Sequence, residues 1–146
     1  MTIERMDHVG VVVDDLEAAI AFFVELGMEV EGRMPVSGRW VDRVCGLDDV
    51  RVDIAMMRTP DGYSRLELTK FHTPTAIGAD SKNAPANTLG IRNIMFAVDD
   101  IEDAVARLQA RGAALVGEIA QYENIYRLCY VRGPAGIIVA LAEKIG

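Results

Sequence analysis

Apolar and polar positions follow the same pattern twice along this chain. Segment 6–17 (MDHVGVVVDDLE) is matched, 85 positions later and without a gap, by segment 91–102 (IRNIMFAVDDIE). Each copy is an apolar run typical of a buried strand, then two aspartates, then apolar positions at helical spacing. A unit of this size cannot bury its own apolar face, so the repeat predicts two equivalent units that face each other. A cleft between such halves is a natural ligand site.

Within the first copy the pattern predicts the order strand, helix, strand, strand, strand. Asp14 is the expected cap of the helix, because Glu17 follows at the spacing of a capping box, and Gly27 is expected to end it. Alternation of apolar and polar residues predicts the later strands, and the sequence TPDG predicts the turn between the last two. The predicted elements are a strand at 6–13, a helix that follows its cap Asp14 and stops at Gly27, a strand at 28–34, a long connection at 35–46 with a short helix near 40–44, and strands at 50–58 and 64–71.

The second copy predicts the same order of elements after an irregular connection at about 73–90. Its expected elements are a strand at 91–98, a helix at 101–111 capped by Asp99, and strands at 115–119, 126–132 and 137–143. The chain is therefore expected to be a single α+β domain made of two βαβββ modules. The first module is expected at about 3–72 and the second at about 91–146.

Length and composition set the class of protein. With 146 residues, 51% of them hydrophobic, the chain can form one domain with a substantial core. No apolar stretch reaches the ~20 residues of a membrane helix, and the first residues lack the layout of a signal peptide. A net charge of −7 argues against nucleic acid and against anionic membranes as partners. Cys45 and Cys129 have no metal-ligand spacing, which is typical of reduced thiols in a cytoplasmic protein.

Four segments carry a resemblance to a known family, namely DHVGVVVDDLEAA at 7–19, RLEL at 65–68, FAVDDI at 96–101 and GPAGIIV at 133–139. Through them the chain resembles the vicinal oxygen chelate superfamily, which includes glyoxalase I, extradiol dioxygenases and bleomycin-resistance proteins. The resemblance covers residue 3 to about residue 143. It implies that the paired modules form curved mixed sheets around a shared cleft that takes a small-molecule ligand.

The resemblance also implies a homodimer, because members of this family commonly dimerise. Phe22 lies beside the main apolar stripe of the first predicted helix. We therefore expect its side chain to be partly exposed in a monomer and covered by a two-fold partner.

The resemblance assigns the metal ligands of the family to four positions, one in the first and one in the last strand of each module. In this chain they are His8, Glu67, Asn93 and Ala140. Alanine has no donor atom, and the neutral oxygen of an asparagine suits hard cations better than zinc. The resemblance therefore implies an incomplete site in which His8 and Glu67 hold Zn, Ni, Mn or Fe weakly. The same two residues are the expected catalytic groups, and Asn93 is expected to contact the substrate.

Further candidates for substrate binding are aromatic and basic residues near the expected cleft. Trp40, Tyr122 and Tyr126 can stack on a planar ligand, and Arg65 can bind a carboxylate or phosphate. His72 follows the last strand of the first module and can serve as a replacement ligand. Each has an ordinary alternative, which is packing for the aromatic residues, a surface ion pair for Arg65 and solvation for His72.

Three functions fit these residues. The first is a glyoxalase-type lyase or isomerase, in which a metal chelates neighbouring substrate oxygens while a carboxylate moves a proton. The second is a metal-free protein that binds a small molecule or sequesters an antibiotic, as bleomycin-resistance proteins do. The third is a metal-free enzyme that uses His8 and Glu67 as an acid and base pair.

Overall fold

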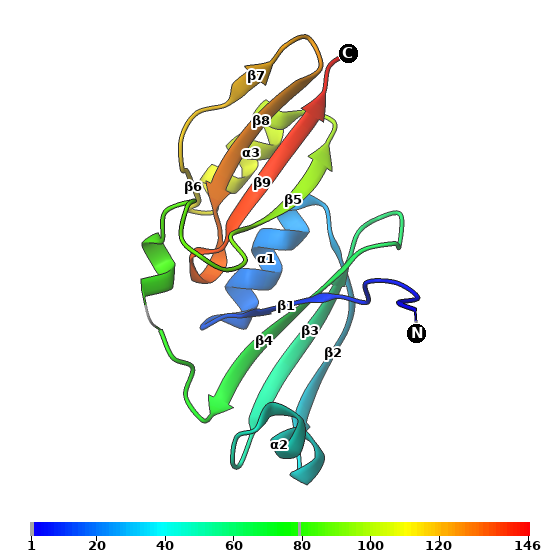
Figure 1. The fold of residues 1–146 in the computed structure, drawn as a ribbon, viewed down its shortest axis with the longest axis vertical. Helices are drawn as coiled ribbons and strands as arrows, with labels where there is room; N and C mark the ends of the chain where they lie inside the picture. The colour runs from blue at the N-terminus through cyan, green and yellow to red at the C-terminus, as the bar shows by residue number, and fades with distance from the viewer. Residues whose placement is uncertain (1, 79) are drawn as a thin grey trace. The chain divides into compact units, whose positions relative to one another are not determined.

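The computed structural model describes residues 2–78 and 80–146 and divides into two compact units, Met1–Ile77 and Gly78–Gly146. Each unit contains one sheet with a helix packed against its strands (Figure 1). The fold is α+β with mixed sheets and one βαβββ module in each unit, as the sequence pattern predicted. Within the described residues no helix is long and apolar enough to cross a membrane.

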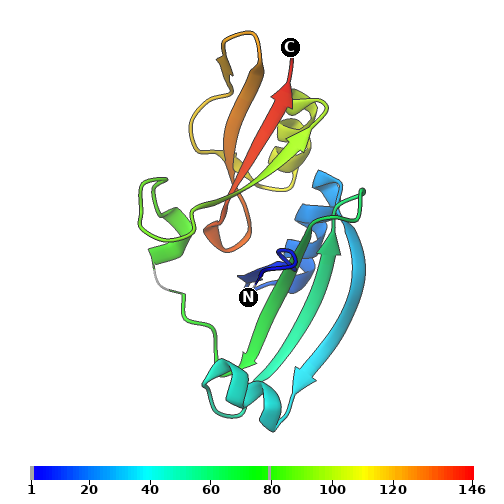
Figure 2. The ribbon, with the colours of Figure 1, turned by 45° about the vertical axis from the view of Figure 1, so that its right-hand side comes forward.

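The first module forms a sheet of four strands in the order β1-β4-β3-β2. Its elements are β1 (Val9–Val12), α1 (Leu16–Leu26), β2 (Glu29–Ser37), α2 (Arg39–Cys45), β3 (Arg51–Arg58) and β4 (Arg65–Thr73). Strands β1 and β4 are parallel, whereas β4, β3 and β2 are joined in antiparallel fashion. The three long strands curve along their length (Figure 2).

The second module repeats this arrangement with a sheet of five strands in the order β5-β9-β8-β6, in which β7 also pairs with β8. Its elements are η1 (Asp80–Asn83), β5 (Asn93–Val98), α3 (Ile101–Ala110), β6 (Ala114–Leu115), β7 (Ala120–Tyr122), β8 (Tyr126–Arg132), η2 (Pro134–Gly136) and β9 (Ile138–Lys144). The parallel pair is again the first strand with the last, here β5 with β9.

The two modules share the register of their parallel strands. In the first module Gly10 is paired with Glu67, and in the second Met95 is paired with Ala140. Met95 follows Gly10 by the same 85 positions that relate the two sequence copies. Ala140 therefore occupies in β9 the position that Glu67 occupies in β4, so the correspondence inferred from sequence holds in the backbone.

The N-cap of helix α1 lies one residue later than expected. Asp15, not Asp14, has the extended backbone of an N-cap, and its carboxylate accepts a hydrogen bond of 3.0 Å from the backbone N–H of Ala18. The same holds for helix α3, whose N-cap is Asp100 rather than Asp99. Its carboxylate accepts a hydrogen bond from the backbone N–H of Asp103, the third helical residue. In each Asp-Asp pair the second residue directly precedes the first helical residue, and only that place satisfies the free N–H groups of the first turn.

The core of the first module lies between α1 and one face of the sheet. The buried side chains of α1 are Leu16, Ala19, Ile20, Phe22 and Phe23. They pack toward the alternate, buried residues of β3 and β4, which include Ala55, Met57, Leu66 and Leu68. A fully buried side chain of the size of leucine contributes roughly 1.5–3 kcal/mol by its removal from water. Residues between these buried positions must point to the other face of the sheet.

Phe22 is buried, which corrects the expectation that it is partly exposed. Its side chain is only 5% exposed, and its ring packs edge-on against Phe23 with 5.1 Å between the ring centroids. The apolar surface of α1 is wider than the stripe inferred from sequence, so Phe22 provides no argument for a dimer.

Among the strands, β1, β2 and the predicted strand 115–119 differ most from expectation. Strand β1 begins at Val9 rather than at residue 6. Strand β2 continues through Pro35 to Ser37, which is tolerated because β2 is an edge strand and the missing N–H of proline costs no ladder hydrogen bond. The predicted strand 115–119 is instead interrupted at Gly117, where a bend separates β6 from β7.

The capping assignment predicts unequal effects of two neighbouring substitutions. Asp15→Ala should lower the free energy of unfolding by about 1 kcal/mol, because it removes a helix N-cap. Asp14→Ala should change it by less than about 0.5 kcal/mol, since it alters an exposed turn residue. Urea denaturation of both variants measures the difference, and equal losses would contradict the assignment.

Candidate functional site

His8 and Glu67 lie together on the face of the first sheet that points away from α1, which we call the site face. Glu67 stands between the buried Leu66 and Leu68 on β4, so its side chain must point away from the helix. His8 directly precedes β1, and its Nε2 lies 3.7 Å from Oε2 of Glu67. The two side chains are 34% and 28% exposed, which leaves both accessible to a ligand. The structure thus brings the two principal candidates together.

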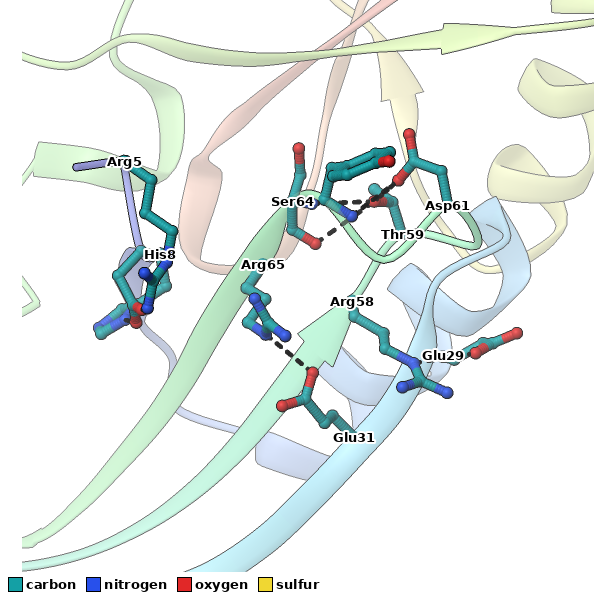
Figure 3. A network of polar contacts seen from close by, with 11 residues as sticks. Arg5, His8, Glu29, Glu31, Arg58, Thr59, Asp61, Ser64 and Arg65 are labelled. Atoms are coloured by element: carbon teal, nitrogen blue, oxygen red, sulfur yellow. Dashed lines mark hydrogen bonds and ion pairs between the residues drawn. The ribbon is translucent and has the colours of Figure 1, made fainter.

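A second carboxylate holds the other side of the His8 ring. Nδ1 of His8 lies 2.8 Å from Oδ2 of Asp7, and the other oxygen of Asp7 accepts a hydrogen bond of 3.2 Å from Nη2 of Arg5. Figure 3 shows Arg5 and His8 next to each other at this edge of the site face. The hydrogen bond with His8, and after it the one with Arg5, holds the pKa of Asp7 below its ordinary value of about 3.8. On the far side of the pair, Thr69 donates a hydrogen bond of 3.4 Å to Glu67.

Sequence reasoning missed Asp7 and Arg5. The sequence feature that indicates Asp7 is the dipeptide Asp7-His8. A carboxylate that accepts a hydrogen bond from one imidazole nitrogen is the usual partner of a functional histidine. The predicted strand at 6–13 included Asp7 as an ordinary strand residue instead.

Charged pairs cover the site face beside His8. Arg65 is paired with Arg58 in the register of β4 and β3. Arg65 donates through Nε to Glu31 at 2.8 Å, and Arg58 donates through Nε to Glu29 at 3.1 Å. Figure 3 shows Arg65 and Glu31 turned toward each other across β3. Arg65, a predicted substrate-binding residue, therefore lies on the same face as Glu67, and it forms an ion pair with Glu31.

The site face becomes apolar with distance from His8. The first row across the strands beyond the charged pairs is Gly10, Glu67, Met56 and Gly32. The next row is Val12, Thr69, Ile54 and Met34. Among the described residues, no atom outside the adjoining residues lies within 4 Å of the point where a side chain of Gly10 or Gly32 would begin, so the row that contains Glu67 is open above both glycines. A ligand on this face would meet polar groups at the His8 end and apolar groups beyond Glu67.

Trp40 lies at the other end of the site face. Helix α2 packs its Val41 into a cluster with Val50 and Val52, which Phe71 also contacts. Phe71 lies four residues along β4 from Glu67, or about 13 Å at the rise of a strand. Trp40 is 62% exposed on this helix, so only a ligand that extends along the sheet would reach both it and Glu67.

The predicted site residues of the second module do not lie together. Asn93 is exposed at the start of β5, paired with Ile138. Tyr122 and Tyr126 face each other across β7 and β8, and Tyr126 is paired with Lys144 at the opposite end of β9. The six residue-to-residue steps from Ile138 to Lys144 span about 20 Å. Asn93 and the two tyrosines are therefore separated within their own sheet.

His72 is not a replacement ligand for the pair on the site face. Its Nε2 lies 2.8 Å from Oδ2 of Asp53. Asp53 is paired with Lys70, and Lys70 alternates with Glu67 and Thr69 to the other face of the sheet. Strand alternation thus places His72 with Asp53 on the opposite side from Glu67.

The donor set of the site face fits a divalent metal in part. An imidazole nitrogen and a carboxylate oxygen are donors that Zn, Ni, Mn and Fe accept. In addition, Asp7 on the second ring nitrogen is the usual outer partner of a metal-bound histidine. At the matching positions of the second module, Asn93 supplies an amide and the fully buried Ala140 supplies no donor.

Comparisons with known proteins agree with the fold. A family model described as Glyoxalase/Bleomycin resistance protein/Dioxygenase superfamily matches residues 7–130. A crystal structure of a glyoxalase family protein from Bacillus cereus is 53% identical, with a TM-score of 0.95 over 100% of this chain and 97% of that one. "Uncharacterized protein YwbC" of Bacillus subtilis (strain 168) is 27% identical over 91% of this chain and 92% of its own length. TnmS3, an antibiotic-binding protein from Streptomyces sp. CB03234, shares the fold, with 22% identity and a TM-score of 0.64 over 99% of this chain and 98% of that one.

The contacts of Asp7 predict a pH effect. Because the pKa of this carboxyl is lowered in the folded state, its contribution to stability is present above its ordinary value near 3.8 and is lost as the pH falls through the lowered value. His8→Ala removes the largest cause and should raise the pKa of Asp7 toward the ordinary value.

A carbon-detected NMR titration of the aspartate carboxyls measures this change. Asp61 is the internal control, because hydrogen bonds from Thr59 and Tyr63 lower its pKa and do not involve His8. A pKa of Asp7 that does not change in His8→Ala would contradict the assigned contact.

Proposed function

Since the chain belongs to the glyoxalase/bleomycin resistance protein/dioxygenase superfamily, we propose that it is a lyase or isomerase acting on a small oxygenated metabolite. The observation that supports this proposal is the 3.7 Å approach of His8 Nε2 to Glu67 Oε2 on an accessible sheet face. Fold membership alone does not select a reaction, so the proposal depends on this pair.

The pair has the chemistry of a proton-transfer site. With Nδ1 of His8 directed at Asp7, the neutral ring presents the lone pair of Nε2 toward Glu67, which is itself an acceptor. Two acceptors directed at each other need a proton, a water or a cation between them. A substrate hydroxyl or an acidic C–H bond beside a carbonyl meets this need, and Glu67 is the group that would take the proton.

A divalent ion would be held by His8 and Glu67. When bound, such an ion would supply Lewis-acid polarisation of substrate oxygens. With two protein donors the site would bind the ion weakly, and water or substrate would complete its shell. The residues themselves orient the substrate. Arg65 can contact an oxyanion at the polar end of the site face, and the apolar rows beyond Glu67 can contact a hydrocarbon part.

The other predicted substrate contacts remain proposals. They are Trp40 at the α2 end of the site face and Asn93, Tyr122 and Tyr126 in the second module. A cytoplasmic location is also a proposal, and it is supported by two free cysteines, as is usual in a reducing compartment.

A second candidate is a metal-free protein that sequesters a small molecule. Ala140 favours it, because the position equivalent to Glu67 has lost any donor. The similarity in fold to the antibiotic-binding protein TnmS3 is compatible with this candidate. In that case His8, Glu67 and Arg65 would hydrogen-bond an unchanged ligand.

Two measurements on the same set of variants test the enzyme proposal. Isothermal titration with Ni²⁺ should show submillimolar binding that weakens at least tenfold, or about 1.4 kcal/mol, in His8→Ala and Glu67→Gln. Exchange of the carbon-bound protons of hydroxyacetone with D₂O, followed by NMR, should fall by roughly 10²-fold or more in Glu67→Gln, because the base is lost. Glu29→Gln is the matched control, since it removes an exposed carboxylate at the edge of the same sheet.

The outcomes separate the candidates. Proton exchange without nickel binding would favour the metal-free acid and base pair. Neither exchange nor nickel binding, together with bleomycin that quenches the fluorescence of Trp40, the single tryptophan, and is recovered unchanged, would favour sequestration. Equal exchange rates in the wild type and Glu67→Gln would contradict the role given to Glu67.

We also propose a homodimer, now on grounds other than Phe22. Val24 on α1 is 47% exposed and Val44 on α2 is 78% exposed, which leaves apolar helix surface for a partner. Light scattering at micromolar concentration should return about twice the chain mass of 15.9 kDa. A mass near that of a single chain would reject the dimer.

A further inference from the structure

We propose that Asp7 is a positioning residue that fixes the tautomer of His8, so that Nε2 presents a lone pair rather than a proton to Glu67. The role of this contact in a reaction rests on the proposed function. The tautomer itself does not, because it follows from the contacts of Asp7, His8 and Arg5 alone.

The position of His8 makes such a device necessary. Strand β1 begins at Val9, so His8 lies just outside the sheet ladder, and its side chain is about one-third exposed. The ring approaches the carboxylate of Asp7 at Nδ1 and that of Glu67 at Nε2. A neutral imidazole carries one proton, and the hydrogen bond made by one nitrogen decides the state of the other.

The distances favour Asp7 as the partner that takes the proton. The contact at Nδ1 is 2.8 Å, which is the length of a charge-assisted hydrogen bond, whereas the contact at Nε2 is 3.7 Å and too long for a hydrogen bond. Arg5 holds the other oxygen of Asp7, and this second contact fixes the plane of the carboxylate.

The consequence concerns the pair on the site face. If Nε2 carried the proton, His8 could turn slightly and donate to Glu67, and the pair would satisfy itself. Neither group would then be free to take a substrate proton or to hold a cation. By keeping the proton on Nδ1, Asp7 keeps Glu67 and His8 as two unsatisfied acceptors. Thr69, which donates to the other oxygen of Glu67, leaves Oε2 available for the ligand.

Asp7→Asn reverses the tautomer in this scheme. Arg5 is a donor, so it would hold the amide oxygen of the new side chain and turn the NH₂ group toward Nδ1 of His8. Nδ1 would have to accept, and the proton would move to Nε2. Asp14→Asn is the matched control, because it makes the same change of charge at an exposed aspartate of the turn before α1.

The experiment is nitrogen NMR of the imidazole rings, recorded at an alkaline pH above which the nitrogen shifts no longer change. The chain has two histidines, and His8→Ala identifies the signals of His8. In the wild type and in Asp14→Asn we expect a protonated Nδ1 and a bare Nε2. In Asp7→Asn we expect the reverse, with the signals of His72 unchanged because its partner is Asp53. A wild-type ring protonated on Nε2, or one tautomer in all variants, would overturn the proposal, and the wild-type spectrum decides even if a variant does not fold.

A second measurement links the tautomer to the site. The affinity for Ni²⁺ should fall by about 10–100-fold in Asp7→Asn and stay unchanged in Asp14→Asn. If Asp7→Asn shows the expected change of tautomer but binds nickel as tightly as the wild type, the link between Asp7 and the pair His8 and Glu67 is overturned. A wild type that binds no nickel but shows the expected tautomers would count against metal binding in the proposed function and would support the inference about Asp7.

Discussion

The parallel pairing of β1 with β4 is the constraint on which the site depends. Parallel neighbours cannot be joined by a tight turn, so the whole of α1, β2, α2 and β3 serves as the connection between them. The pairing brings a histidine from the start of the chain to a glutamate far along it, and its register sets their separation. A shift of one residue would turn Glu67 toward α1 and place a leucine on the site face. The core packing of Leu66 and Leu68 therefore also fixes the face of the sheet on which Glu67 lies.

The two modules have the same backbone positions but different side chains at the candidate site. The second module has the same parallel pair in the same register, yet Asn93 and Ala140 stand where the first module has His8 and Glu67. The backbone of both modules is determined by strand pairing and helix packing, which tolerate these exchanges. The side chains of the candidate site are then a few residues on one face, and exchanging them in one module leaves the fold unchanged.

The sequence predicted the order of elements because the apolar periodicity, the Asp-Asp pairs and the glycines act locally. It missed the cap by one residue, since a glutamate three positions on favoured the first aspartate of each pair, whereas the backbone makes the second one the cap. The proximity of His8 and Glu67 followed from the family resemblance. The roles of Asp7 and Arg5 did not, because their contacts depend on where β1 begins and on side-chain directions outside any regular element. Trp40 and the two tyrosines were grouped with the site from residue type alone, which contains no information on distance along a sheet.

Strand β2 has a consequence beyond the site. It is one of the two edge strands of its sheet, and an edge strand offers unpaired backbone groups to any other extended chain. Here Pro35 removes one donor from that row, and a register irregularity between Val30 and Gly32 interrupts the regular spacing of the rest. These two features make the margin of the sheet a poor template for further strands. The module can thus keep an exposed sheet margin in a crowded solution without promoting fibril growth.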